Sequence, residues 1–291
     1  MIRRRRTLGS GALLRAALAI VSIVMLSRNS AAVELDEPEL TESSGLAWSA
    51  HSEHHLWTHN DSGGRARLFA FDVRTGKRTA ICELSDVVAT DWEAMASFVD
   101  EQGTSKLIVA DCGDNQSRRD HFLIHVFDEP DIDADSRIAA ERIVSVRVRH
   151  AGGPMDCEAV AVDSQERLLL LVGKSRLPLA VVASVPLSEI RRGGKILTTT
   201  PITTLPLSMV TGMDVDRRTG DIWLASYFSL FRFAGSEHVT TLRQQFRQKI
   251  EVVRAPKLRQ IEAIVCDGRG DVWVTSEGSP AVSEKVKRVQ D

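Results

Sequence analysis

Acidic side chains recur in this sequence at the start of apolar segments, each followed by alanine. Three such glutamates are Glu93, Glu158 and Glu262, and aspartates lie two residues before the first two, at Asp91 and Asp156. Residues two apart on a strand point to the same side, so each pair would present its carboxylates together. Carboxylate oxygens suit calcium, which takes six to eight oxygen ligands. The sequence therefore predicts that these five residues form a metal site, with calcium as its cofactor.

A second group of polar residues follows the apolar segments that come next in the chain. The residues predicted to bind a ligand are Asn60, Asp61, Asp111, Asp114, Asn115, Tyr227 and Glu277. Lys174 and Arg176 follow the corresponding segment of the third repeat and supply positive charge suited to an anionic group. Together with Glu158 they are the candidates for catalysis, in which metal-activated water would attack a phosphate or ester.

Three interpretations of these residues stay open. The acids could accept hydrogen bonds from neighbouring backbone and hold the repeats together, with Lys174 and Arg176 as their ion-pair partners. They could bind a small anionic molecule, a cation, or a protein or glycan partner without catalysis, which is our main hypothesis. The alternative is a calcium-dependent hydrolase of a phosphomonoester or another small anionic ester or lactone. No GxSxG, P-loop or HExxH segment occurs, so serine-nucleophile hydrolysis, NTP use and zinc proteolysis lack their usual signals.

The elements that must position these residues repeat along the chain. Five similar segments begin at Ser44, Glu93, Glu158, Thr211 and Glu262, with spacings of 49, 65, 53 and 51 residues. Each starts with a small or acidic residue and Ala or Gly, continues as an apolar strand, and turns into a second strand. Each complete interval holds two more β-like runs. Four strands at a period near 50 residues indicate the blades of a β-propeller.

We therefore predict an all-β fold: a propeller of five four-stranded blades, with residues 33–40 pairing into the last blade and closing the ring. A count of six stays open if the 65-residue interval holds a degenerate blade. A β-sandwich also alternates short strands and turns, but it would not explain the acid-alanine step at blade spacing. In a propeller, the first residues of the repeats and the loops after the second strands meet at one mouth of the central channel.

The first 32 residues have the order of a secretory signal. Four arginines, Arg3 to Arg6, precede an apolar run from Ala16 to Leu26, and Ser30-Ala31-Ala32 supplies small residues for cleavage. The apolar run is shorter than the roughly 18 residues of a membrane span. Arg5-Arg6 also loosely fits a twin-arginine signal, so the export route stays open. We expect residues 1–32 to be removed and residues 33–291 to form one exported propeller domain, periplasmic or extracellular, without a stable membrane span.

Removal of this segment makes the remaining chain acidic. The whole chain has 37 basic and 39 acidic side chains, and the first 32 residues carry six arginines and no acid, which leaves a net charge of −8. Because duplex binding depends on neutralising phosphates, we expect no nucleic-acid partner. We also expect a monomer. Cys266 falls in a predicted buried strand and is interpreted as a core thiol.

Several phrases resemble a family of exported bacterial propeller proteins, loosely similar to phytase-like and SdiA-regulated propellers. They include Asn60-Asp61-Ser62-Gly63, Asp91-Trp92-Glu93-Ala94 and Asp111-Cys112-Gly113-Asp114-Asn115, and the likeness covers nearly all of residues 40–280. The resemblance to phytase-like propellers implies calcium binding and phosphomonoester hydrolysis. Such relatives usually lack cysteine where Cys112 and Cys157 stand here. On this basis we expect a Cys112–Cys157 disulfide between adjacent blades.

Overall fold

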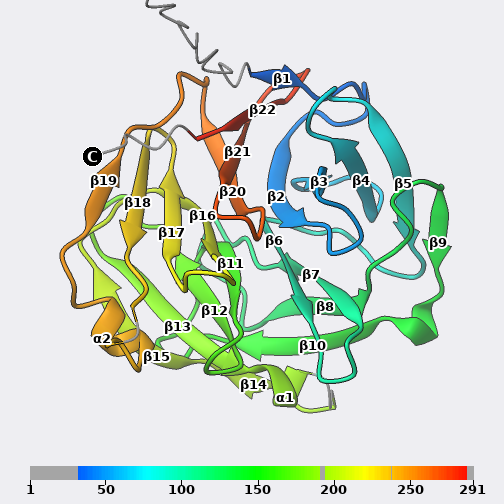
Figure 1. The fold of residues 1–291 in the computed structure, drawn as a ribbon. Helices are drawn as coiled ribbons and strands as arrows, with labels where there is room; N and C mark the ends of the chain where they lie inside the picture. The colour runs from blue at the N-terminus through cyan, green and yellow to red at the C-terminus, as the bar shows by residue number, and fades with distance from the viewer. Residues whose placement is uncertain (1–31, 191–193, 237, 287–291) are drawn as a thin grey trace, which may run out of the picture.

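Five β-sheets surround a common axis in the computed structural model, which describes residues 32–190, 194–236 and 238–286 (Figure 1). The inner strand of each sheet contacts the inner strand of the next, and β20 (Ile261–Cys266) contacts β2 (Ser43–Trp48), so the ring is closed. We call the sheets blades 1 to 5, in the chain order of their inner strands. The all-β propeller with five blades is confirmed.

The strands of each blade follow one another from the axis outward. Blade 1 holds β2, β3 (His55–Asn60), β4 (Arg67–Asp72) and β5 (Arg78–Leu84), with β9 (Ser136–Ile138) at its edge. Blade 2 holds β6 (Ala94–Val99), β7 (Ser105–Asp111), β8 (Phe122–Asp128) and β10 (Val144–Arg149), with β14 (Leu197–Thr198) at its edge. Blade 3 holds β11 (Cys157–Asp163), β12 (Leu168–Gly173), β13 (Ala180–Pro186) and β15 (Thr200–Leu205). Blade 4 holds β16 (Val210–Val215), β17 (Ile222–Ser226), β18 (Ser229–Phe233) and β19 (Glu251–Val253). Blade 5 holds β20, β21 (Val272–Ser276), β22 (Val282–Lys285) and β1 (Val33–Glu34).

Short helical segments lie only in the connections of the described chain. They are a 3-10 turn at Ala140–Arg142, α1 (Leu187–Ile190) and α2 (Leu242–Gln245). Within the described ranges, no helix has the length and apolar character that a membrane span requires. The predicted signal segment lies outside the described residues, apart from Ala32.

Two blades carry a fifth strand that the sequence pattern did not predict. The chain between β8 and β10 forms β9, which pairs in parallel with β5 of blade 1. Likewise, β14 comes from the chain between β13 and β15 and pairs in parallel with β10 of blade 2. The long 65-residue interval is therefore explained by β9, which covers the edge of the preceding blade. The interval holds no sixth blade, and the described chain has five.

The N-terminal strand closes the ring, as predicted. β1 pairs antiparallel with β22, joining Val33 to Ser283 and Glu34 to Val282. Leu35 and Leu40, which follow β1, are fully buried against residues of blades 1 and 5. Both ends of the described chain therefore belong to one sheet.

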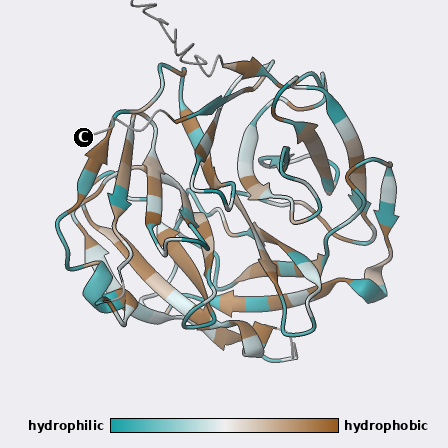
Figure 2. Cartoon of the chain, viewed as in Figure 1, coloured by the Kyte–Doolittle hydropathy of each residue, from teal (hydrophilic) through white to brown (hydrophobic). Residues whose placement is uncertain are grey.

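Apolar side chains fill the spaces between neighbouring blades. All seven residues of β11 and all six of β2 are buried, because an inner strand has a blade on either side. Trp57 of blade 1 and Trp92 next to blade 2 pack in one such interface and are almost completely shielded from solvent. In Figure 2 hydrophobic residues lie mainly on the strands, while many connecting loops are hydrophilic.

The cysteines differ in part from the expectation. All four cysteines are buried and none of them forms a disulfide in the described chain, so the expected Cys112–Cys157 disulfide is not formed. The Cys112 thiol instead donates to the backbone carbonyl of Cys157, with 2.9 Å from Sγ to O. Cys266 is buried in β20, as predicted.

Candidate functional site

The repeated first residue of each blade lies in an irregularity of its strand. A β-bulge contains Ser44, Glu158, Thr211 or Glu262 in four blades, and in the fifth Glu93 directly precedes β6. A bulged residue leaves the strand pairing, which re-aims its side chain. The alanine or glycine that follows admits the neighbouring inner strand: a Cβ on Gly45 would lie 2.8 Å from the backbone nitrogen of Met95. In each repeat, the polar residue therefore turns its side chain out of the strand pairing, and the small residue after it lets the neighbouring inner strand pack closely.

Two of these residues join adjacent blades through hydroxyl groups. Ser44 Oγ donates to the carbonyl oxygen of Glu93, at 3.1 Å, and Thr211 Oγ1 donates to that of Ile261, at 2.8 Å. Ser44 Oγ also lies 3.2 Å from Glu93 Oε2, so the Glu93 carboxylate takes part in this link, whereas Glu158 pairs with Lys174 and Glu262 accepts from Gln260. The interpretation that the repeated residue holds blades together thus applies to the hydroxyl members and to one oxygen of Glu93.

A cavity of about 140 Å³ opens where these residues converge, and we call this end of the channel the front mouth. All five blades contribute to it. Its lining consists of Glu42, Ser44, Asp61, Glu93, Asn115, Glu158, Lys174, Tyr227, Gln260, Glu262 and Glu277. At about 30 Å³ per water molecule, this volume suits a hydrated ion or one small polar group.

Three carboxyl groups form the tightest cluster at the front mouth. One oxygen from each of Asp61, Asp91 and Glu93 lies within 4.8 Å of the other two. Asp61 follows β3, and Asp91 and Glu93 lead into β6, so the cluster bridges blades 1 and 2. Gly113 backs it, because a Cβ there would lie 2.5 Å from the Asp91 carboxyl carbon and 2.7 Å from Glu93 Oε1. We call Asp61, Asp91 and Glu93 the acidic triad.

Burial makes the triad costly to ionise. Burial, followed by the Glu158 carboxylate, raises the pKa of Glu93 to about 10. Burial and the charge of Asp91 raise the pKa of Asp61 to about 6, and burial raises the pKa of Asp91 as well. One carboxyl oxygen of Asp61 is also buried without a hydrogen-bond partner. The triad is therefore a set of oxygen donors that lacks a neutralising group.

The basic residues whose charges act on the triad are engaged elsewhere. Lys174 Nζ lies 2.8 Å from Glu158 Oε1, and Arg119 Nη1 lies 2.8 Å from Asp111 Oδ1. Lys174 also lies over the ring of Tyr227, 5.3 Å from its centroid. Burial opposes the charge on Lys174, but the Glu158 carboxylate outweighs this effect and raises the pKa of Lys174 above its usual value.

Glu158 and Glu262 complete the acidic character of the front mouth. Burial raises the pKa of each to about 7, and the lysine beside Glu158 only partly offsets this. Gln260 donates a hydrogen bond to Glu262. Among the described residues, Glu158 and Glu262 are not in the group of carboxylates whose oxygens lie within 4.8 Å of one another, although both line the same cavity as Glu93.

The structure separates the predicted site residues into two groups. Those that line the front mouth are Asp61, Asn115, Tyr227, Glu277, Glu93, Glu158, Glu262 and Lys174, with Asp91 completing the triad. Arg176 is exposed and is not among the lining residues. The remaining four, Asn60, Asp111, Asp114 and Asp156, do not line the cavity either.

Backbone hydrogen bonds account for these four. Asn60 Oδ1 accepts from the amides of Thr41 and Glu42, and Asp111 accepts from the amide of Thr90. The Asp114 carboxylate accepts from the amides of Arg118 and Arg119, while Asp156 Oδ1 accepts from the amide of Asp114, at 2.8 Å. All four shape loops that carry the site. The sequence analysis did not identify Gly113 as a residue of the site. Its position between Asp111 and Asp114 in a predicted loop was the one feature that could have indicated this role.

Comparisons with known proteins show no family for this chain. No family model matches the chain, and no curated protein matches it. One similar solved structure is the PQQ-bound aldose sugar dehydrogenase from Streptomyces coelicolor, which is 12% identical, with 88% of this chain and 98% of that chain covered and a TM-score of 0.48. Another is a putative glucose dehydrogenase from Thermus thermophilus, which is 11% identical, with 88% and 99% covered and a TM-score of 0.45. These values carry no argument about activity. The expected relationship to phytase-like and SdiA-regulated propellers is not shown and stays a prediction.

Proposed function

We propose that the protein is an exported propeller that binds calcium at its front mouth through Asp61, Asp91 and Glu93. The observation that carries this proposal is the distance: three carboxyl oxygens within 4.8 Å of one another can all reach a single ion. The donors are all oxygens, which favours calcium over softer metals that select sulfur or imidazole. A bound cation would also offset the repulsion among buried carboxylates.

The size of the cavity limits what else binds with the ion. Its volume of about 140 Å³ leaves room for water ligands and one small anionic group, such as a carboxylate or phosphate. Lys174 lines the same cavity from blade 3 and would contact that group. A small anion, or a glycan or protein carrying such a group, is therefore the ligand class that we propose.

The test is a calcium titration of the mature chain by isothermal calorimetry and thermal unfolding. Wild type should bind one calcium ion and unfold at a higher temperature with calcium than with chelator, since a ligand of the folded state stabilises it. The variant Asp91→Asn/Glu93→Gln should lose at least about 100-fold in affinity, because two of three charged ligands are removed. Glu277→Gln, which removes a carboxylate from the same mouth but not from the triad, is the matched control. Absence of calcium binding in the wild type would refute the proposal.

A second candidate function, hydrolysis of a small phosphomonoester, is favoured by one observation. The pKa of Glu158 is about 7, close to the value at which a carboxylate acts well as a general base, and Glu158 lies in the same cavity as the triad. Calcium bound to the triad would supply positive charge to polarise a phosphoryl oxygen. Glu158 would accept a proton from water, and Lys174 would orient the anionic group. Turnover of a phosphomonoester that is lost in Glu158→Gln while calcium binding persists would establish this activity; no turnover with any phosphomonoester would exclude it.

A further inference from the structure

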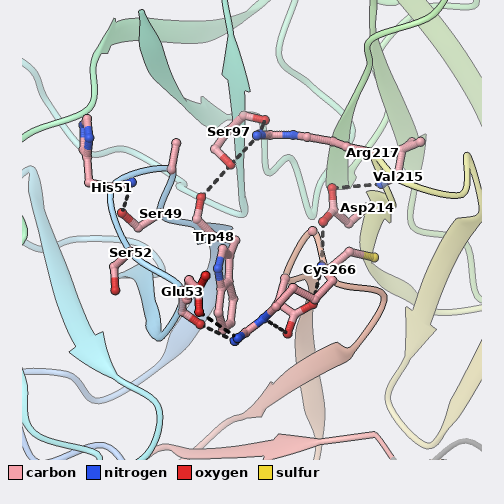
Figure 3. Close-up of a pocket in the computed structure, with 14 residues that line it drawn as sticks. Trp48, Ser49, His51, Ser52, Glu53, Ser97, Asp214, Val215, Arg217 and Cys266 are labelled. Carbon is pink, nitrogen blue, oxygen red and sulfur yellow. Dashed lines mark hydrogen bonds and ion pairs between the residues drawn. The ribbon is translucent and has the colours of Figure 1, made fainter.

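A second and larger cavity lies at the opposite end of the channel. It has a volume of about 450 Å³ and is lined by the ends of inner strands and the turns that follow them in blades 1, 2, 4 and 5 (Figure 3). We call it the rear pocket. Small-molecule sites commonly measure about 300–1,000 Å³, so the rear pocket has the size of a site for a small organic molecule, whereas the front mouth does not.

Arg217 crosses this pocket from blade 4 to blade 2. Its Nη2 donates to Ser97, 2.9 Å from Oγ and also in contact with the carbonyl oxygen. Ser97 Oγ in turn donates to the carbonyl oxygen of Trp48, at 2.8 Å, so one hydroxyl links three blades (Figure 3). Both acceptors of Arg217 are neutral. Within the described residues its Nε and Nη1 make no hydrogen bond, which leaves donors for a planar anion.

The other charged groups of the rear pocket already have partners. Arg269 pairs with Glu53, with 3.1 Å between Nη1 and Oε2, and with Asp267 at 3.7 Å. Asp214 accepts from the amides of Val215, at 2.8 Å, and Cys266, at 2.7 Å. Within the described chain, no carboxylate forms an ion pair with Arg217, so its positive charge is available to a ligand in the rear pocket.

The walls favour an apolar body on the ligand. The indole of Trp48 lines the pocket and is held against Trp273, with ring centroids 5.9 Å apart. Val215 and Ala50 add further apolar surface, and hydroxyls of Ser49 and Ser52 lie among them. Asp214 and Glu53 also face the space, so a dianion such as a phosphate monoester would be repelled more strongly than a carboxylate.

We propose that the rear pocket binds a small organic monocarboxylate, with its carboxylate on Arg217 and its apolar body along Trp48. Guanidinium and carboxylate match in plane and spacing and form charge-assisted hydrogen bonds. The site shares no residue with the front mouth and does not depend on the calcium proposal.

Two probes test it: indole-3-acetate, and indole-3-acetamide as its neutral isostere. Calorimetry on the mature chain in chelator should show that wild type binds the acid about tenfold or more tightly than the amide. Arg217→Gln should weaken the acid by about tenfold and leave the amide unchanged. Arg218→Gln removes a neighbouring exposed arginine outside the pocket and should leave both affinities unchanged.

The same measurements can overturn the proposal. No binding of the acid at millimolar concentration, equal affinity for acid and amide, or full affinity in Arg217→Gln would each refute it. Lys174→Met should bind the acid like the wild type; loss of binding in that variant would place the probe at the front mouth instead. Calcium binding by the triad is read from a separate titration, so the two proposals fail independently.

Discussion

The two ends of the channel use the same residue types in opposite ways. At the rear, Asp214 lies near the end of β16 and Asp267 directly follows β20, and backbone amides occupy their carboxylates. At the front, Asp61 and Glu93 face each other and a cavity, and one Asp61 oxygen has no hydrogen-bond partner within the described chain. Burial raises the pKa at both ends, that of Asp214 to about 6 and that of Glu93 to about 10. A buried carboxylate thus indicates a binding site only where the backbone does not already use its oxygens.

Local strand geometry causes this difference. At the front, Glu158 and Glu262 lie in bulges, where a side chain leaves the strand pairing, while Glu93 directly precedes β6 and Asp61 directly follows β3. At the rear, Asp267 lies in the tight turn between β20 and β21 and accepts amides of its own turn, while Asp214 in β16 accepts the amide of Cys266 in the neighbouring blade. The front mouth is consequently rich in unneutralised acid, and Arg217 supplies the free charge of the rear pocket.

The largest predicted effect is a dependence of stability on pH that comes mainly from the glutamates of the front mouth. In chelator, the unfolding temperature should fall by on the order of 10 °C between pH 5 and pH 9. The folded chain keeps protons on Glu158 and Glu262 up to pH 7 and on Glu93 to higher pH, whereas an unfolded glutamate loses its proton near pH 4.5. This contribution is fully present below about pH 4.5 and is lost as pH rises through the folded pKa values.

Thermal unfolding at several pH values checks this prediction. Calcium should flatten the profile at high pH, because it binds the deprotonated triad and replaces its protons. Glu93→Gln/Glu158→Gln should flatten the profile in chelator as well. A profile in chelator that rises between pH 5 and pH 9 would contradict the high pKa values on which the contrast rests.

The next largest effect is the loss of stability when an ion pair is broken, which should be greater at the front than at the rear. Lys174→Met leaves Glu158 buried without its partner and should cost about 3 kcal/mol at pH 8, or roughly 8 °C in unfolding temperature. The loss should be smaller at pH 5.5, where Glu158 carries a proton, and Glu158→Gln should restore most of it. At the rear, Arg269→Met breaks pairs with the exposed Glu53 and, at 3.7 Å, with Asp267, whose carboxylate keeps its backbone amides, and should cost less than about 1 kcal/mol. Equal losses at both ends would show that burial does not distinguish the pairs.

Gly113→Ala sharpens the comparison by changing geometry without changing charge. The new Cβ would press on Asp91 and Glu93, so calcium affinity should fall by about tenfold while the rear pocket keeps its affinity for indole-3-acetate. Gly152→Ala is the matched control, since a Cβ there meets nothing within 4 Å. Calorimetry with calcium measures both variants. Unchanged affinity in Gly113→Ala would mean that the triad is not the calcium site.

The sequence predicted the front of the molecule better than the rear. Repetition of a polar residue and a small residue marked every inner strand, and alternation placed Asp91 beside Glu93. Spacing could not reveal that β9 adds to the edge of the preceding blade, since parallel pairing between distant segments leaves no periodic signal. Nor could it show that Asp111, Asp114 and Asp156 accept backbone amides, because this depends on loop conformation.

The rear pocket left no trace in the repeat for a related reason. Trp48, Ser97 and Cys266 occupy the same position of their repeats but differ in residue type, and Arg217 lies two residues beyond that position. Only closure of the ring brings them together. A site is visible in sequence where equivalent positions repeat the same residue type, whereas a site whose equivalent positions carry different residue types requires the structure.

The smallest effect compares one hydroxyl at each end. Thr211→Val removes the donor to the Ile261 carbonyl and should cost about 1 kcal/mol, or roughly 3 °C, with calcium and carboxylate affinities unchanged. Ser97→Ala should cost a similar amount of stability, but it also removes an acceptor of Arg217 and should weaken indole-3-acetate by several-fold. Because both hydroxyls link blades, loss of stability alone cannot tell them apart; the ligand affinity does. If both variants bound the carboxylate like the wild type, Ser97 would only link blades, and Arg217 would be held in place without it.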